Sequence, residues 1–291
     1  MKDTLLRASV ENLHLRCFFV NAHQTSNEIC DAHNMTGLAK SLMRRTIAIS
    51  LLTSPLLNDD ERYTLRFQYE GLMEMMVLDV ASNAQIRGFA SALEVKNNIP
   101  MSDLIGPSGK IGLVKSNSKQ QLNSGMTLAD CGDPALDLAT FFNISDQLPT
   151  AIAAFENKNQ CTALMIQAMP GNNPLWIQDL QNKLNQADFE QQSLSMQTPE
   201  KGFNSQLLSL LRSSGHDLSE NDIKLHTVQT PSTFCTCTRD KTLGILNSVP
   251  SEELEFMISK DDGAEISCQF CAKPYIFDSL DLKKIIEVRG S

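Results

Sequence analysis

Two pairs of closely spaced cysteines constrain this chain more than any other feature. One residue separates Cys235 from Cys237, two separate Cys268 from Cys271, and thirty lie between the pairs. Four thiolates around one tetrahedral Zn²⁺ form the usual closed structural site. A C-x-x-C turn between two strands directs both of its sulfurs to one point. The sequence therefore predicts a zinc site with Cys235, Cys237, Cys268 and Cys271 as its ligands.

The region that holds these cysteines, residues 231–291, is too short to build a large core of its own. Metal binding would therefore contribute much of its folding free energy, about 10–16 kcal/mol for structural zinc sites. Thiolates are also the species that oxidants attack, and each close pair offers a resolving partner. We therefore expect a redox-sensitive domain that is folded while its thiols hold zinc and unfolds once oxidation forms local disulfides.

Composition and charge narrow the class of protein. The 291 residues are 42% hydrophobic, which excludes a disordered chain. The net charge of −9 disfavours nucleic acid and anionic membranes as partners. No secretory signal is visible at the N-terminus, and the longest apolar run, Thr46–Leu57, is too short to span a bilayer. We therefore expect a cytoplasmic protein, in whose compartment thiols stay reduced.

Residues 1–171 predict an α+β domain. Apolar spacing indicates a helix over 36–54 with Thr36 as its N-cap, and a second helix over 135–145. Alternating or apolar runs predict strands over 63–70, 74–80, 86–95, 110–117 and 161–171. The segment "ASNAQ" between the second and third of these strands predicts a hairpin.

Residues 172–230 predict a helical linker with a thin apolar stripe. Asn173 is the expected N-cap of a helix over 173–189, with Pro174 in its first turn, and Gly215 ends a second helix over 204–215. Short helices of this kind are marginal in water, so their stability should come from docking on a neighbour. We expect this linker to be metastable.

Residues 231–291 predict the cysteine domain. Helices are expected over 242–248, over 251–259 with Ser251 as the cap, and over 278–286 with Asp278 as the cap. The segment "AEISCQFCAKPYIF" predicts a strand, a turn that carries Cys268 and Cys271, and a second strand.

These residues resemble a known family. "CTCTRDKTLGILNSVPSEELEFMI" and "SCQFCAKPYIFDSLDL" are similar to the zinc domain of the bacterial 33 kDa chaperonins. Earlier segments, "LLTSPLL", "YTLRFQYEG", "QIRGFA", "SDQLPTAI" and "ALMIQAMPG", also resemble family segments in the expected order. The resemblance therefore covers nearly the whole chain.

The resemblance implies a redox-regulated, ATP-independent holdase chaperone rather than an enzyme. It implies that the reduced, zinc-bound protein is inactive, and that oxidants with mild heat form the Cys235–Cys237 and Cys268–Cys271 disulfides. Zinc release and linker unfolding would follow, and a homodimer would hold unfolding client proteins. Melting the linker would expose an apolar client surface, for which we expect Trp176, Leu180, Leu184, Leu207, Leu208 and Leu211.

Two other functions stay open at this point. A zinc-ribbon adaptor or nucleic-acid-binding module is disfavoured, because residues 231–291 hold seven Lys and Arg against ten Asp and Glu. A thiol–disulfide oxidoreductase is disfavoured because no thioredoxin-like βαβ context surrounds the cysteines. Of the remaining cysteines, Cys17, Cys131 and Cys161 are expected to pack as small apolar side chains, and Cys30 is expected to lie on the surface or to take part in helix packing.

Overall fold

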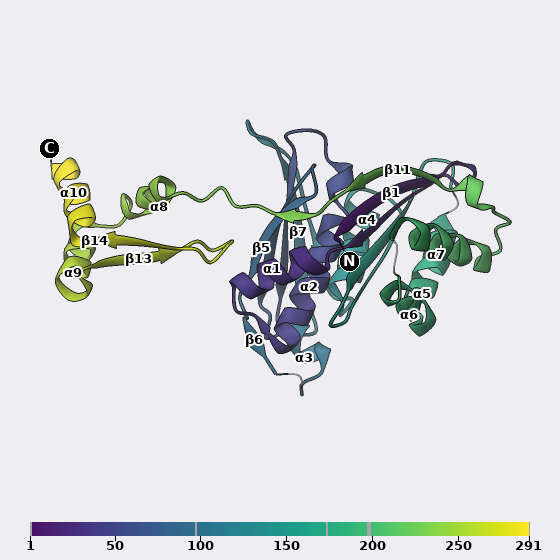
Figure 1. Cartoon of the computed structure of the whole chain (residues 1–291), viewed down its shortest axis with the longest axis horizontal. Coiled ribbons are helices and arrows are strands. Elements are labelled where there is room, and N and C mark those ends of the chain that lie inside the picture. The colour runs from purple at the N-terminus through teal and green to yellow at the C-terminus, as the bar shows by residue number, and fades with distance from the viewer. Residues whose placement is uncertain (1, 97, 173, 197–198, 291) are drawn as a thin grey trace. The chain divides into compact units, whose positions relative to one another are not determined.

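Figure 1 shows the computed structural model, which describes residues 2–96, 98–172, 174–196 and 199–290. These residues form two compact units, one ending at Thr233 and the other beginning at Phe234. The first unit combines two largely antiparallel sheets with helices, and the second combines a β-hairpin with helices. Because the sheets are antiparallel instead of being built from βαβ repeats, the predicted α+β class is confirmed.

The first sheet of this unit is buried on both faces. Its strands run antiparallel in the order β11 (Lys224–Gln229), β1 (Thr4–Val10), β2 (Leu15–Asn21), β10 (Cys161–Ala168) and β9 (Thr150–Glu156). Every residue of β10 is buried, and its alternate side chains belong to two different apolar clusters. A strand covered on both sides carries no polar alternation. This burial explains why the sequence predicted β10 as an apolar run but gave no prediction for β1, β2 and β9.

The second sheet is covered on one face. Its order is β12 (Ser232–Thr233), β5 (Gln85–Ala90), β4 (Met75–Ala81), β3 (Arg62–Tyr69), β7 (Gly109–Ser116) and β8 (Gln121–Leu128), with β12 parallel to β5 and the other pairs antiparallel. On β3, Tyr63, Leu65, Phe67 and Tyr69 are buried. The intervening residues are more exposed, as the predicted alternation requires. The hairpin between β4 and β5 is confirmed, whereas β8 had not been predicted.

A central helix packs between the two sheets of the first unit. The helices before the linker region are α1 (His23–Ala32), α2 (Gly37–Leu51), α3 (Met101–Ile105) and α4 (Pro134–Ser145), and a short strand β6 (Glu94–Val95) bridges to the start of α2. Helix α2 packs against β9 and β10 on one side and against β4 and β5 on the other. Because α2 lies between two sheets, it is buried around most of its circumference, and Arg44, Thr46 and Ser50 are buried along with its apolar side chains. Thr36 occupies its N-cap position as predicted, although its side chain makes no capping hydrogen bond.

Three helices of the predicted linker pack on the free face of the first sheet. They are α5 (Pro174–Leu184), α6 (Ala187–Leu194) and α7 (Pro199–Ser213). Phe203 of α7 stacks on Phe19 of β2 with ring centroids 5.5 Å apart, and Leu180 and Leu184 are buried in the same cluster. The expected docking of these helices is therefore present. The predicted cap Asn173 lies outside the described residues.

The second unit is a hairpin flanked by helices. Its elements are α8 (Arg239–Leu246), α9 (Ser251–Asp261), β13 (Gly263–Ser267), β14 (Pro274–Asp278) and α10 (Ser279–Gly290). The Asp278 carboxylate accepts the Asp281 N–H at 2.9 Å, so the predicted cap of α10 is confirmed. The prediction that Ser251 caps α9 is wrong. The carbonyl of Pro250 already accepts the N–H groups of Glu253 and Leu254, which makes Pro250 the N-cap and Ser251 the first helical residue.

The boundary between the two units falls between residues 233 and 234. Helices α5–α7 and strand β11 therefore belong to the same unit as the first sheet. The predicted three-part division, 1–171, 172–230 and 231–291, stays a prediction about how the chain responds to oxidation. Among the described residues, no helix has the length and apolar character needed to span a membrane.

Docking of α7 gives a first testable prediction. Leu207→Ala should destabilise the first unit by about 2–5 kcal/mol, because Leu207 is fully buried against the sheet and its loss leaves a cavity. Ile144→Ala on α4, where the side chain is 63% exposed, should cost less than about 0.5 kcal/mol. Chemical denaturation followed by circular dichroism measures both. Equal effects would show that α7 is not docked in solution.

Candidate functional site

The four predicted ligand cysteines converge on one point of the second unit. Their sulfur atoms all lie within 4.8 Å of one another. Cys235 Sγ lies 3.7 Å from Cys268 Sγ, and Cys237 Sγ lies 3.5 Å from Cys271 Sγ. A tetrahedral zinc ion with Zn–S bonds of about 2.3 Å requires sulfurs about 3.8 Å apart. The number, type and spacing of these donors therefore fit a structural zinc ion.

Local backbone structure sets the positions of the four sulfurs. Cys268 and Cys271 lie in the turn between β13 and β14, which is closed by hydrogen bonds from Cys268 N to Lys273 O and from Ala272 N to Cys268 O. Cys235 and Cys237 lie in the extended segment before α8, whose N-cap Thr238 accepts the Lys241 N–H. One pair is thus fixed by a hairpin and the other by a capped helix.

A tyrosine that the sequence analysis missed contacts the cluster. Tyr275 Oη donates a hydrogen bond to Cys237 Sγ at 3.1 Å. Burial alone would raise the pKa of the Cys237 thiol, but hydrogen bonds from Tyr275 and the neighbouring cysteines lower it to about 7. Burial raises the pKa of Cys235 and Cys271. Tyr275 alternates regularly with Phe277 along β14, so its sequence pattern indicated only a core position.

A guanidinium group ties the cysteine segment to the rest of the second unit. Arg239 donates to Asp281 Oδ2 at 2.6 Å and to Ile276 O at 3.0 Å, and it stacks 4.3 Å from the ring centroid of Phe277. These contacts hold the start of α8 against β14 and α10. The hydrogen bond from Arg239 also lowers the pKa of Asp281.

The apolar core behind the sulfurs is small. The buried cluster of this unit consists of Leu246, Leu254, Tyr275, Phe277, Leu282 and Ile285. Cys237 and Cys268 pack against it and are themselves only partly buried. A core of this size supplies little stability by itself. Metal binding at the sulfur cluster would therefore contribute a large share of the folding free energy of this unit.

Comparison with known proteins shows the family of this chain. The family model described as the Hsp33 protein matches residues 3–278. The chain belongs to the Hsp33 family. A 33 kDa chaperonin of Geobacter sp. (strain M21) is 27% identical, over 98% of this chain and 97% of the relative. One from Latilactobacillus sakei subsp. sakei (strain 23K) is 25% identical, over 98% and 99%.

A solved structure has the same fold. The crystal structure of the 33 kDa chaperonin (heat shock protein 33 homolog) from Thermotoga maritima superposes with a TM-score of 0.78. It covers 100% of this chain and 99% of its own length at 18% identity. The fold of this Hsp33 family member, both sheets and the cysteine unit included, is therefore that of a solved relative. The resemblance to the 33 kDa chaperonins stated from the sequence is confirmed.

The residues predicted to form a client surface are inside the first unit of this structure. Leu180, Leu184, Leu207, Leu208 and Leu211 are buried in the cluster between α5–α7 and the first sheet. Trp176 is half-buried and packs edge-on against His216, with ring centroids 4.4 Å apart. The structure brings these residues onto one face, and their role in binding stays a prediction.

The other cysteines fall into two groups. Cys17 and Cys161 are buried as expected, and Cys30 is buried in the packing of α1. Burial raises the pKa of each of the three thiols to about 12, which keeps it protonated and unreactive. The expectation that Cys131 packs in the same way is wrong, because it is exposed just before α4. Its sulfur lies 3.5 Å from Thr140 Oγ1.

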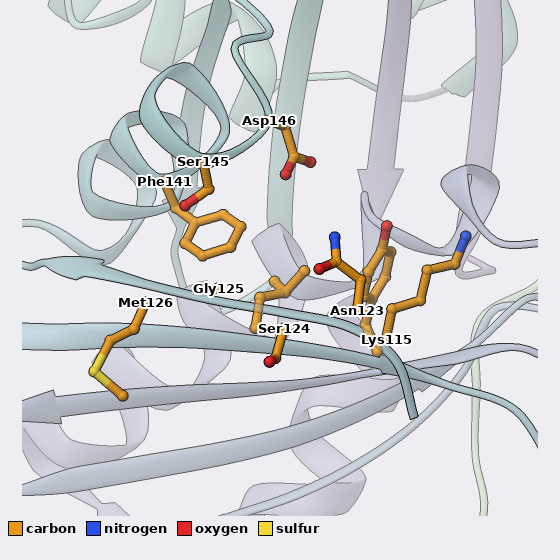
Figure 2. A pocket seen from close by; sticks show the side chains of 10 residues that line it. Lys115, Asn123, Ser124, Gly125, Met126, Phe141, Ser145 and Asp146 are labelled. Carbon is orange, nitrogen blue, oxygen red and sulfur yellow. The ribbon is translucent and has the colours of Figure 1, made fainter. Parts of the chain in front are cut away.

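A hollow of about 260 Å³ lies between β7, β8 and α4. Figure 2 shows Lys115, Asn123 and Met126 on the strand side, and Phe141, Ser145 and Asp146 on the helix side. Lys115 Nζ is held by Glu61 at 2.8 Å, so its charge is already satisfied. None of the residues predicted from the sequence as site residues lines this hollow.

The Arg239 contacts give a second prediction. Arg239→Lys should destabilise the second unit by about 1 kcal/mol. Lysine keeps the charge, but it lacks the planar guanidinium group that donates to both Asp281 and Ile276 O and stacks on Phe277. The carboxylate of Asp281 has a lowered pKa, so its contribution is present above its unfolded pKa and is lost as the pH falls through the folded pKa.

The cost of Arg239→Lys should therefore stay constant down to about pH 5 and shrink only as the pH falls below about 4. Calorimetry of the full chain measures it, with the exposed Lys283→Arg as the matched control. A pH-independent cost would show that the ion pair with Asp281 contributes nothing, and would assign the effect to the stacking on Phe277 and the hydrogen bond to Ile276 O.

Proposed function

We propose that this Hsp33 family member is a redox-regulated, ATP-independent holdase chaperone. The observation that supports the proposal best is the convergence of four partly exposed sulfurs in a unit with a small core. Relatives across nearly the whole chain are named as 33 kDa chaperonins, which supports a non-enzymatic role in binding unfolded proteins.

In the reduced state, Cys235, Cys237, Cys268 and Cys271 would hold Zn²⁺ as four thiolates. When bound, the ion supplies the charge that keeps the sulfurs deprotonated and fixed in one tetrahedron. The two segments that carry the cysteines, before α8 and between β13 and β14, are then tied together. The second unit stays folded, and the chaperone stays inactive.

In the oxidised state, each cysteine pair forms a disulfide. One thiolate attacks a peroxide oxygen, the O–O bond breaks, and a sulfenic acid and hydroxide form. The partner thiolate attacks this sulfur, forms the S–S bond and expels a second hydroxide. Two electrons pass from the sulfurs to one peroxide for each disulfide. The oxidised sulfurs are no longer thiolate ligands, so the second unit loses the interaction that compensates for its small core.

The proposed pairing is Cys235–Cys237 and Cys268–Cys271. All four sulfurs are close enough that distance alone does not select a pairing. Pairing within each segment lets the two segments separate, whereas pairing across them would leave them linked and the unit constrained. Only local pairing therefore gives an unfolding switch.

The switch has a direct covalent route to the first unit. Cys235 follows β12 by two residues, and β12 follows β11 after a two-residue connection. Strand β11 pairs with β1, but Leu225 and Val228 are 36% and 53% exposed and none of its described side chains belongs to a buried cluster. A strand held mainly by its edge hydrogen bonds is readily displaced when the segment after it unfolds.

Release of α5–α7 would uncover the client surface. The helices leave with Leu180, Leu184, Leu207, Leu208 and Leu211, and the sheet face beneath them is equally apolar. This face includes Leu6, Phe19, Leu164 and Ile166. Large exposed apolar faces of this kind bind unfolded chains. We further propose that the active form is a homodimer and that it acts in the cytoplasm.

The pairing gives a third prediction. Peroxide treatment of the zinc-loaded protein at about 40 °C should release zinc, and peptide mapping without reduction should find the Cys235–Cys237 and Cys268–Cys271 disulfides. Cys271→Ser should lower the zinc content and destabilise the second unit, whereas Cys131→Ser should leave both unchanged. Disulfides across the two segments would contradict the proposed switch.

The function itself gives a fourth prediction. Peroxide-treated protein should suppress the aggregation of a heat-unfolded client, measured by light scattering, and reduced zinc-loaded protein should not. Reduction of the treated sample with added zinc should remove the activity. If both forms suppress aggregation equally, the sulfur cluster is only structural. If neither does, the chaperone proposal fails.

A further inference from the structure

The edge strand β9 presents backbone groups that helix side chains cover. In an antiparallel edge strand, alternate residues direct N–H and C=O away from the sheet. The Thr150 N–H donates to Asn143 Oδ1 of α4 at 2.7 Å, and the Ala154 carbonyl accepts from Arg45 Nε of α2 at 3.2 Å. Side chains that satisfy such groups keep an open edge from pairing with other chains.

The central position of this edge is covered differently, by a single amide from α5. Gln181 Oε1 accepts the Ile152 N–H at 2.8 Å, and Gln181 Nε2 donates to the Ile152 carbonyl at 2.9 Å. A side-chain amide offers the same donor and acceptor as a peptide group. Gln181 therefore occupies the place that a residue of a neighbouring strand would take.

A groove runs beside this contact. A hollow of about 470 Å³ lies between α4 and α5 at the start of β9, and Ala139, Pro149 and Ile177 are among its lining residues together with Gln181. Its lining is mixed, with apolar side chains from both helices and the edge backbone of Thr150. Such a groove beside an edge strand fits an extended peptide segment.

We propose that the β9 edge is a latent strand-pairing site for extended segments of unfolded clients, and that Gln181 is the plug that blocks it in the reduced state. This inference rests on the proposed function, because α5 belongs to the helices that oxidation is proposed to release. Asn143 and Arg45 lie on α4 and α2 and stay in place, so release of α5 frees only the N–H and C=O of Ile152 for pairing with a client segment.

The chemistry of the site defines its partner. Backbone pairing with Ile152 is independent of client sequence, which suits a protein that binds many unfolded chains. Alternate side chains of a paired segment would face the sheet surface that α5–α7 leave, where Ala151 and Ala153 belong to the apolar cluster. The preferred client segment is therefore extended, with an apolar residue at every second position.

The test uses the full-length protein and two labelled peptides. Both alternate valine and threonine between terminal lysines, and one carries N-methyl groups on the backbone nitrogens of its central six residues. Backbone methylation removes the donors of strand pairing and leaves the side chains unchanged. Peroxide-treated protein should bind the unmethylated peptide at least tenfold more tightly, measured by fluorescence anisotropy, and zinc-loaded protein should bind neither.

Two variants test the plug without oxidation. Gln181→Leu keeps the bulk of the side chain but removes both hydrogen bonds, so the Ile152 amide should exchange with solvent at least tenfold faster in zinc-loaded protein, measured by NMR. Gln178→Leu lies on the same helix and lines the same groove, and it should leave this rate unchanged.

Failure of this inference differs from failure of the proposed function. If oxidised protein suppresses aggregation but binds both peptides equally, clients are recognised by side chains alone and the pairing site is refuted. If Gln181→Leu leaves the Ile152 exchange rate unchanged, the plug is refuted. If oxidised protein neither suppresses aggregation nor binds either peptide, the chaperone function and the pairing site both fail.

Discussion

Under the proposed function, the second unit depends on the contact among its four cysteine sulfurs. Behind it lies an apolar cluster of a few side chains, to which Cys237 and Cys268 contribute partly buried surface. A core of this size gives little margin against the entropy of unfolding. The same sulfurs are the most readily oxidised groups of the unit once they are thiolates. The proposal therefore places folding stability and redox sensitivity in the same four atoms.

The layers of the first unit determine what unfolding of the second unit would expose. Its first sheet is buried by α2 on one face and by α5–α7 on the other. Helix α2 is enclosed between two sheets, whereas α5–α7 form an outer layer and are short enough to be marginal alone. We therefore propose that one apolar face of the sheet stays covered by α2 and that the other is uncovered when α5–α7 are released. The β9 edge is also covered in part by the outer helices, because Gln181 belongs to α5 and would leave with it.

Local pattern was sufficient to predict the elements with one buried face. Strand β3 and the hairpin that carries Cys268 and Cys271 were predicted near their true positions. Strands β1, β2 and β9 were not, because burial on both faces removes the alternation that marks a strand. Strand β11 was missed for the opposite reason: its side chains are largely exposed, and its partner β1 lies more than 200 residues away in sequence. The ligand cysteines were predictable from spacing, whereas Tyr275 and Gln181 act through contacts that no local pattern encodes.

The most direct test of the account follows both units in one sample during oxidation. Zinc-loaded protein is titrated with peroxide, and bound zinc and the amide exchange of α5–α7 are measured at every point. We expect α5–α7 to lose their protection from amide exchange in proportion to zinc release, while α2 and β10 stay protected. If zinc is released completely and α5–α7 remain protected, the sulfur cluster is not coupled to the linker helices, and the proposed switch is contradicted.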